Sequence, residues 1–233
     1  MPKSVSLCLS GGGFRATLFH LGVIRALREF DLLKEVRYIF SVSGGSILAA
    51  HLALNWERYA SADEGEFRAV AGNLVALVRS DIRGRLVRRW LLMGWLPHYH
   101  RDQQLIRAYE RFYRRALLER LRATNRPRVY LLATSMISGE VCAFTSEGLI
   151  RICTTDSQEL IPLADLPVSV AVAASSAFPV FFPPIYLDRK ILGVTGPEML
   201  CWRGPDGRRR VRQPRRANSC RHARNKRHDI CSE

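Results

Sequence analysis

The sequence lacks several features that would assign it to a class at once. It opens with Met-Pro-Lys and a strand-like run, without the charged and apolar leader of a secreted protein. Its six cysteines include no CxxC pair, and no Cys/His spacing is typical of a zinc site. We therefore expect a cytoplasmic protein with reduced thiols, and neither a metal nor an organic cofactor.

One segment is long enough to span a membrane, but its composition argues against a spanning helix. Residues 166–187 form a run of 22 residues without a charge, but the run contains four prolines. Each proline removes a backbone donor and breaks or kinks a helix. The run is predicted to form a buried helix followed by an irregular loop.

The chain does have enough apolar residues for a core, and a large excess of positive charge. Its 233 residues are 47% hydrophobic, which excludes wholesale disorder. The formal net charge is +15, and residues 201–233 hold 11 of the Lys+Arg but only 3 of the Asp+Glu. Because this last stretch shows no apolar period, we predict one domain over residues 4–200 and a basic, disordered tail over residues 201–233.

Two successive units of strand, glycine turn and helix open the chain. The apolar runs 5–9 and 38–42 each end at glycines, and apolar residues at helical spacing follow both turns. Repeated units of this kind predict an α/β fold with a parallel sheet and helices packed on it. Further strands are expected at 129–134, 141–145, 149–152 and 185–187, and further helices at 46–56, within 63–122 and at 164–174.

The second turn, Ser41-Val42-Ser43-Gly44-Gly45, has the layout of a nucleophile elbow. A serine between a strand and a helix is held in a strained backbone conformation that exposes its hydroxyl. The residues two before and two after it must be small, and Ser41 meets this condition in place of the usual glycine. A plain strand–helix turn, with small residues for packing alone, is the alternative.

The first turn contains Gly11, Gly12 and Gly13, whose backbone N–H groups can converge on an anion beside a helix N-terminus. The Lys and Ser/Thr of a phosphate-binding P-loop are absent, and Ala16 breaks the dinucleotide fingerprint. An oxyanion hole for acyl transfer fits better. A serine on one strand–helix junction beside such a hole on the neighbouring junction is the arrangement that acyl transfer needs.

Three segments together resemble the patatin-like phospholipase family: LSGGGFRATLFHLGVIRAL at 9–27, SVSGGSI at 41–47 and ASSAFPVFFPP at 174–184. The resemblance covers about residues 4–200. It implies a three-layer α/β/α fold with a mainly parallel central sheet, and a Ser–Asp dyad that hydrolyses acyl esters of lipids. It also implies that Ser43 is the nucleophile and that the amides of Gly11, Gly12 and Gly13 form the oxyanion hole. A non-catalytic lipid- or membrane-binding protein that keeps this fold is the alternative.

A Ser–His–Asp triad is a rival to the dyad. His20 and His51 lie within predicted helices and are expected to be structural, and the other four histidines flank a proline turn or lie in the tail. None is well placed for a general base, which favours an aspartate that activates serine directly.

The aspartate itself is the weakest part of the resemblance. The family places it in a D-G-[GA] motif downstream of residues 174–184, where this chain offers only Asp206-Gly207-Arg208. Codons can be chosen for Asp206 to Arg215 such that the same bases, read from the second base of the Gly207 codon, encode Asp-Gly-Gly-Val-Tyr-Asp-Asn-Leu. We therefore hypothesise a frameshift near residues 190–204, which would leave the product poorly active.

A basic and aromatic stretch lies at residues 79–96, where Arg83, Arg85, Arg88 and Arg89 precede Trp90. Solvated helix faces are the simpler interpretation. The alternative is peripheral binding to anionic membranes, with the basic residues at the head groups and the apolar residues in the interface. No motif for specific nucleic-acid binding accompanies the positive charge.

Overall fold

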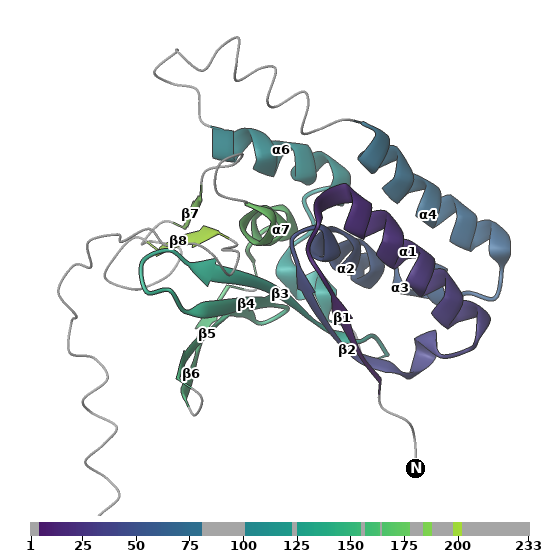
Figure 1. Cartoon of the computed structure of the whole chain (residues 1–233), viewed down its shortest axis with the longest axis horizontal. Coiled ribbons are helices and arrows are strands. Elements are labelled where there is room, and N and C mark those ends of the chain that lie inside the picture. Colours follow the sequence, from purple (N-terminus) through teal and green to yellow (C-terminus); the bar gives the residue numbers. More distant parts are fainter. Residues whose placement is uncertain are drawn as a thin grey trace, which may run out of the picture.

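The computed structural model describes residues 5–80, 101–122, 125–154, 157–163, 165–177, 184–187 and 198–201. The chain begins with two successive βα units, as predicted: β1 (Val5–Leu9) with α1 (Gly13–Glu29), then β2 (Val36–Val42) with α2 (Gly44–Leu54) (Figure 1). The later elements are α3 (Trp56–Ala60), α4 (Glu64–Arg79), α6 (Arg101–Tyr113), β3 (Arg128–Ser135), β4 (Val141–Thr145), β5 (Gly148–Thr154), β6 (Ser157–Pro162), α7 (Val168–Ser176), β7 (Ile185–Leu187) and β8 (Glu198–Cys201). Short 3-10 helices cover Leu33–Glu35 and Leu118–Leu121.

The sheet is parallel where it begins and antiparallel beyond. Strand β2 lies between β1 and β3 and pairs with both in parallel, since helices connect these strands. Strands β3, β4, β5 and β6 then pair in sequence order, all antiparallel, and β8 pairs antiparallel with β3 and β7. The predicted α/β class is confirmed, and the two glycine turns follow the neighbouring parallel strands β1 and β2.

Helix α2 is the centre of the core. Every residue of α2 from Gly44 to Ala53 is buried, which is the structural counterpart of a sequence that is apolar on nearly every face. The helix packs against β2 and β3, and α1 and α7 pack against it in turn. Helix α6 lies across α7, and α4 lies alongside α1 (Figure 1). The candidate serine therefore lies at the first turn of the most enclosed helix in the described part of the chain.

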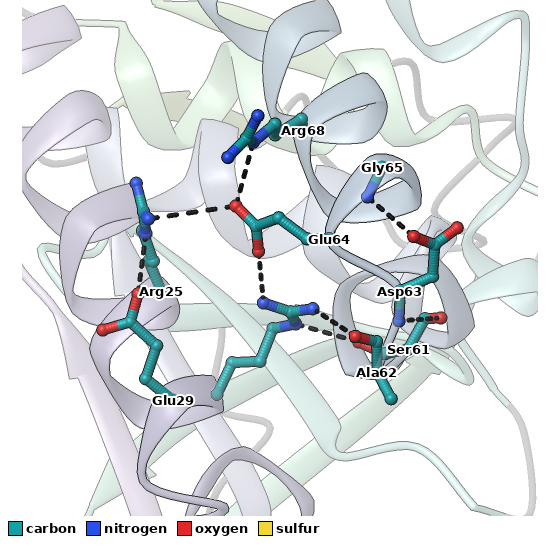
Figure 2. A network of polar contacts seen from close by, with 9 residues as sticks. Arg25, Glu29, Ser61, Ala62, Asp63, Glu64, Gly65 and Arg68 are labelled. Carbon is teal, nitrogen blue, oxygen red and sulfur yellow. Dashed lines mark hydrogen bonds and ion pairs between the residues drawn. The ribbon is translucent and has the colours of Figure 1, made fainter.

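An ion-pair network ties α4 to α1 (Figure 2). Glu64, in the first turn of α4, accepts a hydrogen bond from Arg28 of α1 at 2.7 Å and one from Arg68 of its own helix at 3.1 Å. Arg28 also donates to the carbonyl oxygens of Ser61 and Ala62. The hydrogen bonds from Arg68 and Arg28 lower the pKa of the Glu64 carboxyl. Because Arg28 reaches three acceptors, it joins α1 to both the loop and the first turn of α4.

Several element boundaries differ from those predicted, each for a local reason. The predicted helix 46–56 ends at Leu54, and a separate helix, α3, begins at Trp56. Asn55 between them donates through its side chain to the carbonyl oxygen of His51 at 2.9 Å, which caps the end of α2. The predicted helix 164–174 starts only at Val168, since Pro167 precedes it in an extended conformation.

Two strands were not predicted, and some predictions fall outside the described residues. Strand β6 is polar over its first half and is defined by its pairing with β5, and β8 by its pairing with β3 and β7. The loop after α7 (178–183), the stretch 79–96 beyond Ser80 and the tail 201–233 beyond Cys201 are outside the described residues. Arg79 ends α4, and Cys201, assigned to the tail, ends β8. Among the helices that are described, none combines the length and apolar character needed to cross a membrane.

Candidate active site

Ser43 occupies the turn between β2 and α2 in a backbone conformation that residues other than glycine rarely adopt. Its φ is 53° and its ψ is −114°, and its carbonyl oxygen already accepts the first hydrogen bonds of α2, from the amides of Ser46 and Ile47. A non-glycine residue held in such a region costs about 1–3 kcal/mol, which the surrounding structure must offset. The strained turn holds Ser43 at the N-terminal end of α2. The residue is only 9% exposed, so it is buried rather than exposed as the elbow pattern predicted.

The structure brings the two glycine turns into direct contact. A Cβ atom added to Gly44 would overlap the carbonyl oxygen of Gly13, and one added to Gly45 would overlap that of Leu9. A Cβ atom on Gly11 would lie 3.4 Å from the Cβ atom of Ser43. The glycines of the second turn are therefore required by the close approach of the first, and Gly11 packs against the candidate nucleophile.

The first turn carries backbone amides suited to an anion. Gly12 and Gly13 both have positive φ values, 133° and 63°, and α1 begins at Gly13. The first amides of a helix have no acceptor within the helix, and the helix dipole places positive charge at this end. The turn that carries these amides approaches Ser43, since a Cβ atom on Gly11 would contact the Cβ atom of Ser43.

Thr17, for which no role was predicted, joins the two turns. Its side chain is fully buried, and Oγ1 lies 2.7 Å from the carbonyl oxygen of Gly44 and 3.2 Å from that of Gly13. A threonine four residues after the last glycine of the turn is the signal that could have indicated this contact.

A chain of buried hydroxyl groups connects the second turn to α7 and β3. Ser175 of α7 accepts a hydrogen bond from the backbone N–H of Ser43 at 3.0 Å and donates to the carbonyl oxygen of Leu132 at 2.6 Å. Ser46 lies 2.8 Å from Ser175 and 3.0 Å from Ser41. Ser175 lies in the segment that resembles the family but had no predicted role, and the signal for it is a pair of adjacent serines at the end of a helix that is mostly apolar.

Comparison with known proteins identifies the family. A sequence model described as "Patatin-like phospholipase" matches residues 7–202. The chain belongs to the patatin-like phospholipase family. No curated protein sequence matches this patatin-like chain.

Solved structures support the same fold. Human GIVD cytosolic phospholipase A2 in complex with methyl gamma-linolenyl fluorophosphonate is 18% identical, with a TM-score of 0.50, over 75% of this chain and 29% of that one. A second structure of the human protein is 17% identical, with a TM-score of 0.52, over 76% of this chain and 28% of that one. VipD from Legionella pneumophila is 14% identical, with a TM-score of 0.44, over 86% and 46%. The patatin-like chain thus spans less than a third of the human protein, and the likeness to that protein agrees with the predicted three-layer α/β/α fold.

The described part of this patatin-like chain shows no general base beside Ser43. The Ser43 hydroxyl forms no hydrogen bond there, and no group of three His, Cys, Asp or Glu side chains in these ranges could hold a metal ion. His20 lies near the first turn, but its Nε2 is 3.2 Å from both the hydroxyl and the carbonyl oxygen of Ser10. Asp206 and the remaining four histidines lie outside the described residues.

His51 belongs to the core. Its Nδ1 lies 3.0 Å from the hydroxyl of Tyr59, and its ring stacks on that of Phe112 with 5.0 Å between centroids. Burial, followed by the positive charge of Arg58, lowers the pKa of His51 from 6.5 to about 4. The imidazole is therefore neutral at pH 7, as expected for a structural histidine.

Acidification should destabilise the protein through His51. Between pH 6.5 and pH 4 the unfolded chain binds a proton at this residue and the folded chain does not. The free energy of unfolding should fall by roughly 1.4 kcal/mol per pH unit, about 3 kcal/mol in all, with no further loss from this group below pH 4. Urea unfolding curves at several pH values measure it. A His51→Asn variant, which keeps a polar atom near Tyr59, should lack this part of the pH dependence. An unchanged pH dependence in the variant would contradict the assignment.

Proposed function

We propose that this chain is a serine hydrolase of lipid acyl esters, of the phospholipase A or esterase type. The observation that carries the proposal is the contact between the strained Ser43 turn and the Gly11–Gly13 turn. Membership of the patatin-like phospholipase family supports the substrate class. A solved structure of the human phospholipase in complex with a lipid-like fluorophosphonate, a class of reagent that reacts with activated serines, supports the reaction type.

In this mechanism the Ser43 hydroxyl attacks the ester carbonyl, the ester C–O bond breaks, and the alcohol part of the lipid leaves with a proton. Water then hydrolyses the acyl-enzyme and releases the fatty acid. The amides of Gly11, Gly12 and Gly13 stabilise the oxyanion of each tetrahedral intermediate, and each such donor contributes about 3 kcal/mol. The amide of Ser43 itself is occupied by Ser175. We therefore assign the donors of the hole to the first turn, and the close approach of Gly11 to Ser43 supports this assignment.

The proton of Ser43 passes to an aspartate in the proposed Ser–Asp dyad. Asp206 is the one residue of this chain with part of the expected motif, and Arg208 stands where a small residue is expected. The family match ends at residue 202, close to the hypothesised frameshift, which supports the idea that the dyad is incomplete in this chain. We propose that its activity is correspondingly low.

A fluorophosphonate probe with an alkyl chain tests the role of Ser43. We expect mass spectrometry of the folded protein to find the phosphonyl group on Ser43, because the attack that forms this adduct resembles the attack on an ester. Labelling should disappear in Ser43→Ala and persist in Ser138→Ala, where an exposed serine is lost from the turn after β3. Absence of labelling, or labelling that survives Ser43→Ala, would favour the non-catalytic lipid-binding alternative.

We also propose a cytoplasmic location with peripheral contact to anionic membranes through residues 79–96. The support is the sequence alone, in which arginines adjoin Trp90 and Trp95. Of this stretch the structure describes only Arg79 and Ser80, so the contact stays a prediction.

A further inference from the structure

A groove unrelated to the Ser43 turn lies at the opposite end of α2. Its volume is about 540 Å³, within the usual range for small-ligand sites. Residues from α2, α3, α4, α6 and the segment after α6 line it. The first groove residue on α2, His51, is eight residues after Ser43, which at a rise of 1.5 Å per residue is about 12 Å along the helix.

Four arginines line this groove, which we name the arginine groove: Arg58, Arg111, Arg114 and Arg120. They come from α3, from α6, from the turn after α6 and from the 3-10 helix Leu118–Leu121. No Asp or Glu lines the groove, and within the described residues none of the four guanidinium groups forms a hydrogen bond or ion pair. By contrast, the arginines between α1 and α4 have a counter-charge, because each of them forms an ion pair with Glu64 (Figure 2).

Arg111, Arg114 and Arg120 are exposed and Arg58 is half-buried, and no Asp or Glu lines the groove beside them, so the grouping of four positive charges here asks for a reason. Capping of α2 is not that reason, because Arg126 already donates to the carbonyl oxygen of Ala53 at 3.2 Å and Asn55 donates to that of His51. The charge of Arg58 also acts on another residue of the groove lining, since it contributes, after burial, to the lowered pKa of His51.

We propose that the arginine groove binds two or more phosphate groups, carried by one small ligand or by neighbouring lipid head groups. Guanidinium groups present several donors in a plane and match phosphate oxygens in pairs, which suits clustered phosphates better than a single carboxylate. The amide of Asn73 and the ring of Phe112, both in the lining, add a polar and an apolar contact for the rest of the ligand. Such phosphates belong either to a soluble polyphosphate or to a phosphate-monoester lipid head group.

Calorimetric titration with inorganic tripolyphosphate tests the soluble source, and sedimentation with phosphatidylcholine vesicles with or without phosphatidic acid tests the lipid source. The variant Arg111→Gln/Arg120→Gln should weaken binding to whichever probe the protein prefers by at least about tenfold, since charge-assisted hydrogen bonds are lost. The control Arg37→Gln/Arg107→Gln removes equal charge from exposed positions outside the groove, one of them on α6 itself, and should bind as the original chain does.

The two binding experiments distinguish the soluble source, the lipid source and general attraction to positive charge. Binding of tripolyphosphate that depends on the groove supports a soluble ligand, and groove-dependent binding of phosphatidic acid vesicles alone supports a lipid head group. Equal loss in the two paired variants would show attraction to general positive charge and overturn the proposal, as would a failure of the original chain to bind either probe. Unfolding curves confirm that both variants fold.

Discussion

Replacement of Gly44 by alanine is expected to destabilise the protein by about 3–5 kcal/mol, a large part of the stability of an ordinary domain. The added methyl group would lie 2.8 Å from the carbonyl carbon of Gly13 and would overlap the carbonyl oxygen. These are backbone atoms at the start of α1, so no side chain can move aside. The two glycine turns would have to separate, and labelling of Ser43 should fall with them. Denaturant unfolding and fluorophosphonate labelling measure the two effects.

Gly22 and Gly72 provide matched controls for this substitution. Both lie inside helices, α1 and α4, and no heavy atom is within 4 Å of the position where a Cβ atom would stand. Gly22→Ala and Gly72→Ala should therefore stabilise the protein by about 0.5–1 kcal/mol, because alanine loses less backbone freedom on folding. If Gly44→Ala proves as stable as these two variants, the close contact between the turns does not exist in solution.

A chain with a restored reading frame is expected to hydrolyse lipid esters roughly 10⁴-fold faster than the chain as it stands. The restored gene carries a one-base shift within codons 190–204, so that Asp-Gly-Gly-Val-Tyr-Asp-Asn-Leu is translated after the segment that the family model matches. The reason is that an aspartate on a small-residue turn would supply the base that Ser43 lacks among the described residues. Release of fatty acid from mixed phospholipid micelles measures the rate.

Two variants of the restored chain serve as controls, Ser43→Ala and Asp→Asn at the new motif, and both should return the rate to that of the original chain. The original chain should be insensitive to Asp206→Asn. If Asp206→Asn instead abolishes a measurable activity of the original chain, Asp206 is the dyad partner and the frameshift hypothesis is wrong. Resequencing of the gene across codons 185–233 tests the same hypothesis at the level of DNA.

Features that depend on neighbouring residues could be predicted from the sequence. Strands β1 and β2, the glycine turns after them and the burial of α2 all follow from apolar runs and glycine positions. Glycine is the residue that tolerates positive φ and close backbone approach, and an all-apolar helix has no face for solvent. The place of Ser43 between a strand and a helix was predicted for this reason, while its chemical role stays a prediction.

Features that depend on distant residues were decided by the tertiary structure. Ser175 accepts a hydrogen bond from the Ser43 amide across a separation of 132 residues, and Thr17 reaches Gly44 across 27. The local sequence shows a polar residue at each position but does not indicate its distant partner. Strand β6 exists because β5 offers it a partner. The arginine groove is the same kind of feature, since its four charges come from separate elements and meet only when α3 and α6 pack beside α2. Sequence alone determined which local conformations the chain could adopt, because these depend on each residue and its neighbours. Only the packing of remote elements decided which side chains share a site.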